Sequence, residues 1–427
     1  MNIIKEIKSE RVGDKYYEVE HSSGLKIFIY PKENNNSTYA VFGTKYGSVD
    51  VNFKTSDEKE ANAVPAGIAH YLEHKLFESE DGDAFTRYAK TGASANAYTS
   101  FDKTCYLFSC TENVYESLEI LLDFVQTPYF TEQTVQKEQG IIGQEIRMYD
   151  DDPQWRVMFN LLRAMYHNHP VRVDIAGTVE SIAEITPELL YKCYHTFYNL
   201  NNMVLCVAGN VDLNKVLDLC DKMLKPSKPV SLERIFENEP DEVLESRVEQ
   251  KLSVSSPIFQ LGFKEHTMPE RLSAKEVAET EILLDLLASD ASPLFRRLLD
   301  AELINESSFS YEYFEGPGYA SVIFSGESKD PDAVADEIKK EIAKVRENGL
   351  NPEAFERSKK AVYGRMIASL NSVDNIANSM AALAFTGHEI FHYIDLIAAS
   401  DIDSVQARLN TQLRPEYSAL SVVNPIN

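Results

Sequence analysis

The chain has 427 residues, of which 44% are hydrophobic and 10% aromatic, so it can bury the cores of two or three globular domains. Its 67 acidic residues outnumber its 42 basic residues and give a formal net charge of −25 at pH 7. Such an excess of negative charge argues against binding to nucleic-acid phosphates or to anionic membrane surfaces. Solubility is the simplest explanation of the charge, and a preference for basic peptides is the alternative.

Neither a signal peptide nor a transmembrane helix is predicted. Charged residues interrupt segment 1–8 every few positions, and no uncharged apolar run reaches the about 18 residues that a membrane span requires. The 5 cysteines are an odd number without a Cys-x-x-Cys pair, which argues against both a disulfide framework and a thiolate zinc site. We therefore expect a cytoplasmic protein with reduced thiols that binds neither nucleic acid nor membrane.

Strands and helices are mixed along the first half of the chain. Runs of β-branched and aromatic residues predict strands over residues 23–30, 39–53, 106–110 and 202–207. Apolar residues at helical spacing predict helices over residues 65–76, 113–127 and 131–149. Pro65 suits the first turn of the first helix, and Thr131 is a candidate cap for the last one. This mixture indicates an α+β fold.

The stretch 226–250 differs from its surroundings, because it combines three prolines and several acids with few periodic apolar residues. We interpret it as a linker between two domains, 1–225 and 251–427. The second half repeats the pattern of the first, with predicted strands and helices over residues 257–263, 319–325, 332–347 and from 351 onward. Two α+β domains related by duplication are therefore expected.

The clearest chemical motif is His70-Tyr71-Leu72-Glu73-His74. On a helix, His70 and His74 lie four residues apart on one face, so both imidazoles could reach a single metal ion. Glu73 projects from nearly the same face, which suits a carboxylate that accepts a proton from a water made more acidic by zinc. This H-x-x-E-H order is typical of inverted zincins. The alternative is an ordinary helix that carries two histidines by chance, and it predicts no third ligand.

A third ligand is available in the helix predicted over residues 131–149. Glu138 and Glu145 are seven residues apart in this helix and therefore share a face. One carboxylate could complete a His₂Glu site with a fourth position open for water, while the other could orient a ligand histidine. Such pairs are common on solvated helix faces, so spacing alone leaves their roles open.

A second motif, His388-Glu389-Ile390-Phe391-His392, has the H-E-x-x-H order of thermolysin-like peptidases. Gly387 predicts that a helix begins at this point. The acidic residues downstream fit no spacing expected of a third ligand. We therefore expect an ordinary helix start without metal, in which Ile390 and Phe391 pack inward.

Together these segments resemble the pitrilysin family of metallopeptidases, which includes insulysin and the mitochondrial processing peptidase. The resemblance rests on the segments GIAHYLEHKLF (67–77), GASANAYT (92–99) and IAGT (175–178), and it is strong to about Asp212. It implies a short, two-domain bacterial type of fold. Each of two homologous domains would be a mostly antiparallel sheet packed against helices, and together they would form half of a clamshell. Domain 1–225 would be the active zinc-binding peptidase domain and 251–427 an inactive one.

The resemblance also implies roles for particular residues. Three of them would bind one Zn²⁺ per chain: His70, His74 and Glu145. Glu73 would be the general base, and Glu138 would be the second carboxylate that orients a ligand. Asn96 and Ala97 correspond to the edge strand on which an extended substrate peptide is bound by strand addition. A simple turn role is the alternative for Asn96.

The second half lacks these ligands, because Met366 and Lys359 stand where the two glutamates would align. Leu299 and Glu306 likewise occupy the positions of a substrate-clamping arginine and tyrosine found in many family members. The resemblance also implies a dimer around an enclosed chamber, because short family members usually pair two chains in this way. The preferred form is a heterodimer with a metal-free relative that supplies the missing residues, and a homodimer is the alternative.

The function expected from this resemblance is a zinc-dependent endopeptidase that hydrolyses peptides or unfolded segments in an enclosed chamber. Two alternatives remain open. The chain could be a non-catalytic processing or assembly subunit, although such subunits typically lose metal ligands. It could also be a maturation factor that uses the same chemistry on one dedicated protein.

Overall fold

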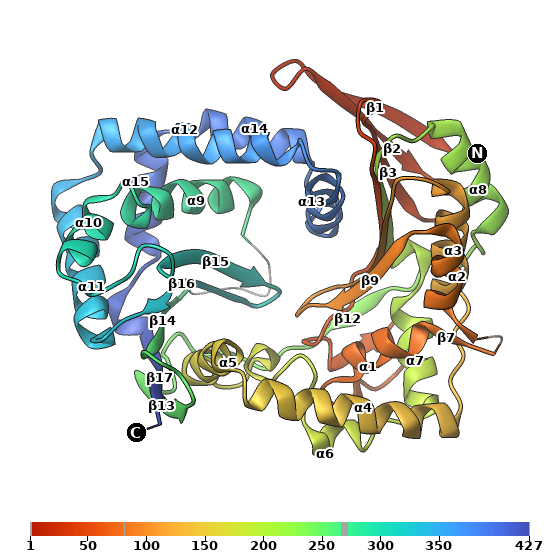
Figure 1. Cartoon of the computed structure of the whole chain (residues 1–427), viewed down its shortest axis with the longest axis horizontal. Coiled ribbons are helices and arrows are strands. Elements are labelled where there is room, and N and C mark those ends of the chain that lie inside the picture. Colours follow the sequence, from red (N-terminus) through yellow and green to blue (C-terminus); the bar gives the residue numbers. More distant parts are fainter. Residues whose placement is uncertain (1, 81, 266–271, 427) are drawn as a thin grey trace. The chain divides into compact units, whose positions relative to one another are not determined.

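The chain folds into two units, and each unit combines segments from both halves of the sequence (Figure 1). The computed structural model describes residues 2–80, 82–265 and 272–426. Unit 1 comprises Met1–Ile146, Asp174–Ile235 and Ile367–Phe391. Unit 2 comprises Arg147–Val173, Phe236–Met366 and His392–Asn427. In the described part of the chain, no helix is both long and apolar enough to cross a lipid bilayer.

Unit 1 is built on a seven-stranded sheet with the order β1-β2-β3-β11-β4-β10-β9. Its strands are Ile3–Ser9 (β1), Asp14–Glu20 (β2), Lys26–Pro31 (β3), Thr38–Thr44 (β4), Ser94–Thr99 (β9), Thr104–Cys110 (β10) and Met203–Gly209 (β11). Neighbouring strands are antiparallel except β3 and β11, which are parallel. Strand β9 lies at one edge of this sheet and pairs with β10.

Helices cover this sheet on both faces. The helices of unit 1 are Ile68–Leu76 (α1), Ala84–Thr91 (α2), Val114–Val125 (α3), Val179–Ile182 (α6), Pro187–Phe197 (α7), Leu213–Met223 (α8), Val373–Thr386 (α13) and most of Glu132–Asp150 (α4). Helix α13 lies on the face opposite α2 and α3 (Figure 1). On the α3 face, the Tyr106 ring of β10 lies 5.7 Å from the Phe124 ring.

Short elements complete unit 1. They are Asn52–Thr55 (β5), Asn62–Ala63 (β6) and Leu232–Arg234 (β12) in a small sheet, the hairpin of Glu78–Ser79 (β7) and Gly82–Asp83 (β8), and the 3-10 turn Leu200–Asn202. All five cysteines are unbridged and buried, which agrees with the expectation of reduced thiols.

Unit 2 contains a five-stranded sheet with the order β13-β17-β14-β16-β15. Its strands are Arg247–Leu252 (β13), Ile258–Lys264 (β14), Ser310–Gly316 (β15), Tyr319–Glu327 (β16) and Ser418–Pro425 (β17). Its helices are Pro153–Met165 (α5), Ala274–Ala288 (α9), Pro293–Asp300 (α10), Pro331–Asn348 (α11), most of Pro352–Ser369 (α12), most of Ile390–Ala399 (α14) and Ile402–Thr411 (α15), with 3-10 turns at Pro170–Arg172 and Pro415–Tyr417.

The two sheets repeat one topology. The order β3-β11-β4-β10-β9 in unit 1 corresponds strand for strand to β13-β17-β14-β16-β15 in unit 2. Each series begins with a parallel pair and continues with antiparallel pairs. This repetition confirms the predicted α+β class with two homologous, mostly antiparallel sheets packed against helices.

One helix from each half of the sequence packs on the sheet of the other half. Helix α5 follows β10 in the chain but packs on β14 and β17, whereas α13 follows β16 but packs on β4 and β11. A glycine in β4 and another in β14, which are corresponding strands of the two sheets, make room for the incoming helices. A Cβ atom at Gly43 would lie 3.1 Å from the Phe385 ring, and one at Gly262 would lie 2.5 Å from Met165 Sδ.

Two predicted elements differ in extent from those observed. The strand predicted over residues 39–53 is divided into β4 and β5, because the chain turns between Gly47 and Asp50, where the Asp50 amide donates a hydrogen bond to the Gly47 carbonyl at 3.1 Å; Gly47 begins this turn. A Cβ atom there would lie 2.3 Å from the Asp102 amide nitrogen, so only glycine fits this turn. The predicted linker 226–250 contains β12 and the first part of β13. The domain limits 1–225 and 251–427 stay predictions about the duplicated sequence.

Candidate metal centre

Helix α1 carries three of the candidate residues, and its position is set by close backbone packing at its start. Gly67 precedes the helix with φ of 89°, in the left-handed region that favours glycine. A Cβ atom at Gly67 would lie 2.3 Å from the Ala176 carbonyl oxygen, and one at Gly177 would lie 2.4 Å from the Ala66 carbonyl oxygen. These contacts explain why the helix begins at Ile68 rather than at the predicted Pro65.

Helix α4 carries the two candidate glutamates and packs beside α1. Val135, Ile142 and Ile146 are buried on one side of α4. The Tyr71 hydroxyl of α1 donates a hydrogen bond to the Val135 carbonyl, which ties the two helices together. The predicted cap at Thr131 is observed, since its hydroxyl accepts a hydrogen bond from the Thr134 amide at 3.2 Å.

The fold brings the two histidines and Glu145 together. His74 Nε2 lies 3.4 Å from Glu145 Oε2, and His70 Nε2 lies 3.8 Å from Glu145 Oε1. Glu138 approaches the other side of one imidazole, where His74 Nδ1 lies 3.0 Å from Glu138 Oε1. The two glutamates therefore differ in position: Glu145 faces both imidazoles, whereas Glu138 fixes the orientation of His74.

The donor set suits zinc. Two atoms bound about 2.0 to 2.2 Å from a tetrahedral zinc ion lie about 3.4 Å apart, and the distances from Glu145 to the two imidazoles are near this value. His70, Glu73 and His74 also place one potential ligand atom each within 4.8 Å of one another, and the described residues contain no other such group of histidine, cysteine and acidic side chains. Nitrogen and carboxylate ligands are compatible with zinc and with other divalent transition metals.

Burial sets the protonation of the site. Burial lowers the pKa of His70 to about 3, so its imidazole is neutral near pH 7 and keeps a lone pair for a metal. Burial raises the pKa of Glu73 to about 7. Burial also opposes the charged form of His74, but the hydrogen bond that His74 donates to Glu138 and the carboxylates of Glu73 and Glu145 outweigh it and raise that pKa.

The edge strand β9 runs beside this cluster. The Thr99 hydroxyl at its end donates a hydrogen bond to Glu73 Oε2 at 3.3 Å. Asn96 is exposed, and its side chain accepts a hydrogen bond from the Ala97 amide at 2.9 Å. Thr99 belongs to the segment 92–99 that carries the family resemblance, but its role could not be predicted from the sequence, because its partner Glu73 is distant along the chain.

A cavity of about 520 Å³ connects the cluster with the edge strand. Its lining includes Glu73 and His74 from α1 together with Asn96 and Ala97 from β9. Glu138 also lines it, as do aromatic, aliphatic and acidic side chains, among them Phe77, Phe85, Ile141, Glu78 and Asp83. The candidate base, one candidate ligand and both candidate peptide-binding residues thus share one cavity.

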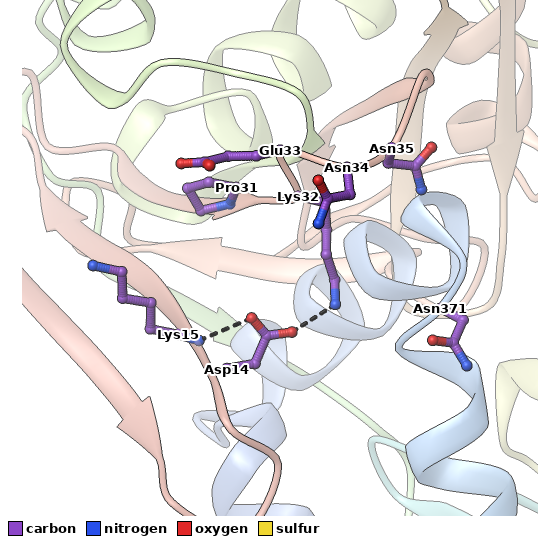
Figure 2. Close-up of a pocket in the computed structure, with 8 residues that line it drawn as sticks. All are labelled: Asp14, Lys15, Pro31, Lys32, Glu33, Asn34, Asn35 and Asn371. Carbon is purple, nitrogen blue, oxygen red and sulfur yellow. Dashed lines mark hydrogen bonds and ion pairs between the residues drawn. The ribbon is translucent and has the colours of Figure 1, made fainter.

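A second cavity of unit 1, of about 490 Å³, has a different character. Figure 2 shows its polar lining, in which Asp14 accepts hydrogen bonds from the Lys32 ammonium group at 2.5 Å and from the Lys15 amide at 3.3 Å. Its lining holds neither histidine nor cysteine. This lining therefore offers no set of metal ligands comparable to that of α1 and α4.

The H-E-x-x-H motif does not lie on one helix. His388 and Glu389 precede α14, which begins at Ile390. Ile390 and Phe391 are buried, as expected, and the Phe391 ring lies 5.1 Å from that of Tyr16. The structural setting therefore agrees with a packing role for this segment.

Comparison with family models gives two matches along the chain. Residues 52–179 match the model described as insulinase (peptidase family M16), and residues 184–362 match the model described as the peptidase M16 inactive domain. The first match includes all of the candidate site residues on α1, β9 and α4.

Similar proteins extend over the whole chain. A Bacillus subtilis protein called uncharacterized zinc protease YmfH is 40% identical, over 99% of this chain and 100% of that protein. A solved structure of an M16-like peptidase from Alicyclobacillus acidocaldarius is 35% identical, with a TM-score of 0.91 over 100% of this chain and 99% of that one. A protease structure from Helicobacter pylori, 21% identical over 96% of this chain and 100% of that one, has the same fold with a TM-score of 0.81.

Proposed function

The chain belongs to the insulinase family of peptidases, family M16, and we propose that it is a zinc-dependent endopeptidase acting on peptides or unfolded segments. The main support is the meeting of two imidazoles with Glu145 beside Glu73 and the edge of β9. The name zinc protease given to a relative of 40% identity agrees with this proposal.

In this proposal, one Zn²⁺ per chain is held by His70, His74 and Glu145. The bound ion would lower the pKa of a water molecule and polarise the scissile carbonyl. Glu138 would accept a hydrogen bond from the Nδ1–H group of His74, which keeps the proton on Nδ1 and leaves the Nε2 lone pair free for a metal on the side of Glu145.

Glu73 would act as the general base. Its carboxylate is buried, and a pKa of about 7 is close to the value at which a base is most effective near neutral pH. It would accept a proton from the attacking water and return it to the departing amine. The hydrogen bond from Thr99 would hold the carboxylate toward the substrate side of the cavity.

The substrate would be bound as an added strand. Strand β9 uses one of its two sides for β10, and its other side can form main-chain hydrogen bonds with an extended peptide. Asn96 and Ala97 lie on this strand and line the cavity that contains Glu73. A peptide paired there would cross the proposed metal site in a fixed register.

The test is the variant Glu73→Gln. It should keep its zinc, because Glu73 is not among the proposed ligands, and peptide hydrolysis should fall by about 10² to 10⁴-fold, since the base is lost. Zinc content is measured by elemental analysis and turnover with a quenched fluorescent peptide. The double variant His388→Ala, His392→Ala is the matched control and should keep both zinc and turnover.

Three outcomes would contradict parts of this proposal. Wild-type turnover in Glu73→Gln rejects Glu73 as the base. Loss of zinc in the His388, His392 control moves the metal to the second motif. A wild-type chain that binds no zinc favours the alternative of a non-catalytic processing or assembly subunit.

We further propose a dimer in the cytoplasm, with a metal-free relative as the preferred partner and a second copy as the alternative. In the second half, Lys359 donates a hydrogen bond to the Ser400 carbonyl at 2.7 Å and so serves a structural role. A relative 28% identical over 41% of this chain and 34% of that protein is named probable mitochondrial-processing peptidase subunit beta, from Arabidopsis thaliana. Light scattering and peptide turnover, measured with and without a candidate partner, distinguish the two forms.

A further inference from the structure

The edge strand β9 contacts helices on both of its faces. Successive side chains of a strand alternate between faces, so Ala97 and Thr99 share one face and Asn96 and Tyr98 share the other. Thr99 faces α1, where it donates its hydrogen bond to Glu73. Tyr98 therefore faces the opposite side of the sheet, on which α13 lies (Figure 1).

Tyr98 makes a specific contact with α13. Its hydroxyl donates a hydrogen bond to Asn378 Oδ1 at 3.4 Å, across 280 residues of sequence. The Asn378 amide group in turn donates hydrogen bonds to the Tyr39 hydroxyl of β4 at 3.4 Å and to the Asp374 carbonyl at 2.9 Å. Asn378 thus links the edge strand to a strand in the interior of the sheet.

Helix α13 is itself fixed firmly on the sheet. Its buried residues are Val373, Ile376, Ala377, Met380, Ala381 and Phe385. Phe385 packs against Gly43 of β4. Gly43 is opposite Cys105 of β10, and Cys105 is opposite Tyr98 of β9. The helix is anchored on β4, two strands away from the edge. Asn378 can therefore hold the Tyr98 side chain in a fixed place relative to the interior of the sheet.

An edge strand has a hydrogen-bonded ladder on one side only, so side-chain contacts contribute more to its position than they do in the interior. A peptide that pairs with β9 requires its free backbone groups in a defined place. We propose that Asn378, through Tyr98, positions β9 for substrate binding, so that a helix from the C-terminal half of the sequence takes part in peptide recognition by unit 1. This inference rests on the proposed peptidase function.

The test compares variants of Asn378 and Tyr98 in the full-length, zinc-loaded protein. Tyr98→Phe removes the hydrogen bond to Asn378, and Asn378→Ala removes that bond together with those to Tyr39 and the Asp374 carbonyl. In both variants KM should rise about 3- to 10-fold with little change in kcat, because the ground state and the transition state lose the same binding energy. The double variant should be no worse than Asn378→Ala alone, since that variant already removes the contact that Tyr98→Phe removes. Asn378→Asp keeps an acceptor for Tyr98 and should restore KM.

Two further measurements separate this positioning role from a general loss of structure. Asn375 is exposed on the same helix, so Asn375→Ala should keep the wild-type KM, zinc content and thermal midpoint. In the Glu73→Gln background, Asn378→Ala should weaken binding of a fluorescein-labelled peptide, chosen from those that the wild type cleaves, by the same factor as KM.

The outcomes distinguish the positioning role of Asn378 from the proposed peptidase function. If the wild type cleaves peptides but Asn378→Ala keeps both KM and peptide affinity, the positioning role is wrong and the proposed function stands. If Asn378→Asp fails to restore KM although it folds and holds zinc, the hydrogen bond to Tyr98 is not the cause. If the wild type neither binds nor cleaves any peptide, alone or together with a candidate partner, the proposed function fails and this inference fails with it.

Discussion

At the scale of single residues, the geometry separates two glutamates that the sequence could not distinguish by spacing. Glu145 lies within 3.8 Å of both Nε2 atoms, whereas Glu138 contacts the Nδ1 atom of His74. This difference supports the roles proposed for them as ligand and orienting carboxylate. Thr99 is an additional residue of the site, because its hydroxyl reaches the proposed base.

Removal of the Thr99 hydroxyl should slow catalysis without loss of metal. Thr99→Val keeps nearly the same volume but leaves Glu73 without this donor, so we expect kcat to fall by about tenfold. Thr99→Ser retains the hydroxyl and should keep most of the activity. Zinc content should be unchanged in both variants, and a valine variant with the wild-type kcat would show that Glu73 needs no such support.

At the scale of elements, the site depends on where α1 begins. The backbone at Gly67 meets that at Ala176 too closely to accept a side chain, and φ of 89° at Gly67 is costly for other residues. A segment distant in the chain therefore fixes the start of the helix that carries His70, Glu73 and His74.

Gly67→Ala should destabilise the protein by more than about 1 to 2 kcal/mol, the cost of the left-handed conformation alone, because the added Cβ also collides with backbone. Gly364→Ala is the matched control, since its Cβ would lie in open space within helix α12. We expect Gly364→Ala to raise the free energy of unfolding by about 0.5 to 1 kcal/mol. Urea unfolding of both variants measures this, and equal midpoints would contradict the packing argument.

At the scale of the whole molecule, the two units are not the two halves of the sequence. Helix α13 contributes its buried face to unit 1, and α5 contributes to unit 2 in the same way. Each half of the sequence therefore leaves the apolar face of a sheet uncovered unless the other half is present. The repeated strand order nevertheless agrees with the duplication expected from the sequence.

Residues 1–225 produced alone should aggregate, because the face of β4 and β11 that α13 covers would be exposed. Production together with residues 226–427 as a second chain should give a soluble, associated pair, because α13 can again cover that face. Size-exclusion chromatography and zinc content measure the result. A stable, monomeric 1–225 fragment would contradict the role assigned to α13.

The matching control is the full-length chain with an engineered protease site after Val230, which is exposed. The chain is cut at this site after it has folded. The two pieces should stay associated after cleavage, since the exchanged helices are already in place. Their separation under native conditions would show that α13 contributes little to the stability of unit 1.

Local patterns in the sequence determined much of this protein. Helical spacing predicted α1, α3 and α4, and composition predicted the central strands β3, β4, β10 and β11, because burial of one face imposes a period on the residues that form it. The same period placed His70 and His74 on one face of a helix. The α+β class and the family followed from these segments and are confirmed.

Only the tertiary structure decided which distant residues meet. It placed Glu145 rather than Glu138 against both imidazoles, left β9 at the edge of a sheet, exchanged α5 and α13, and brought Asn378 to Tyr98. The physical reason is that sequence periodicity reports which face of one element is buried but not which element covers it. That choice depends on how apolar faces far apart in the chain pack together, and here it connects the second half of the sequence to the proposed peptide-binding strand.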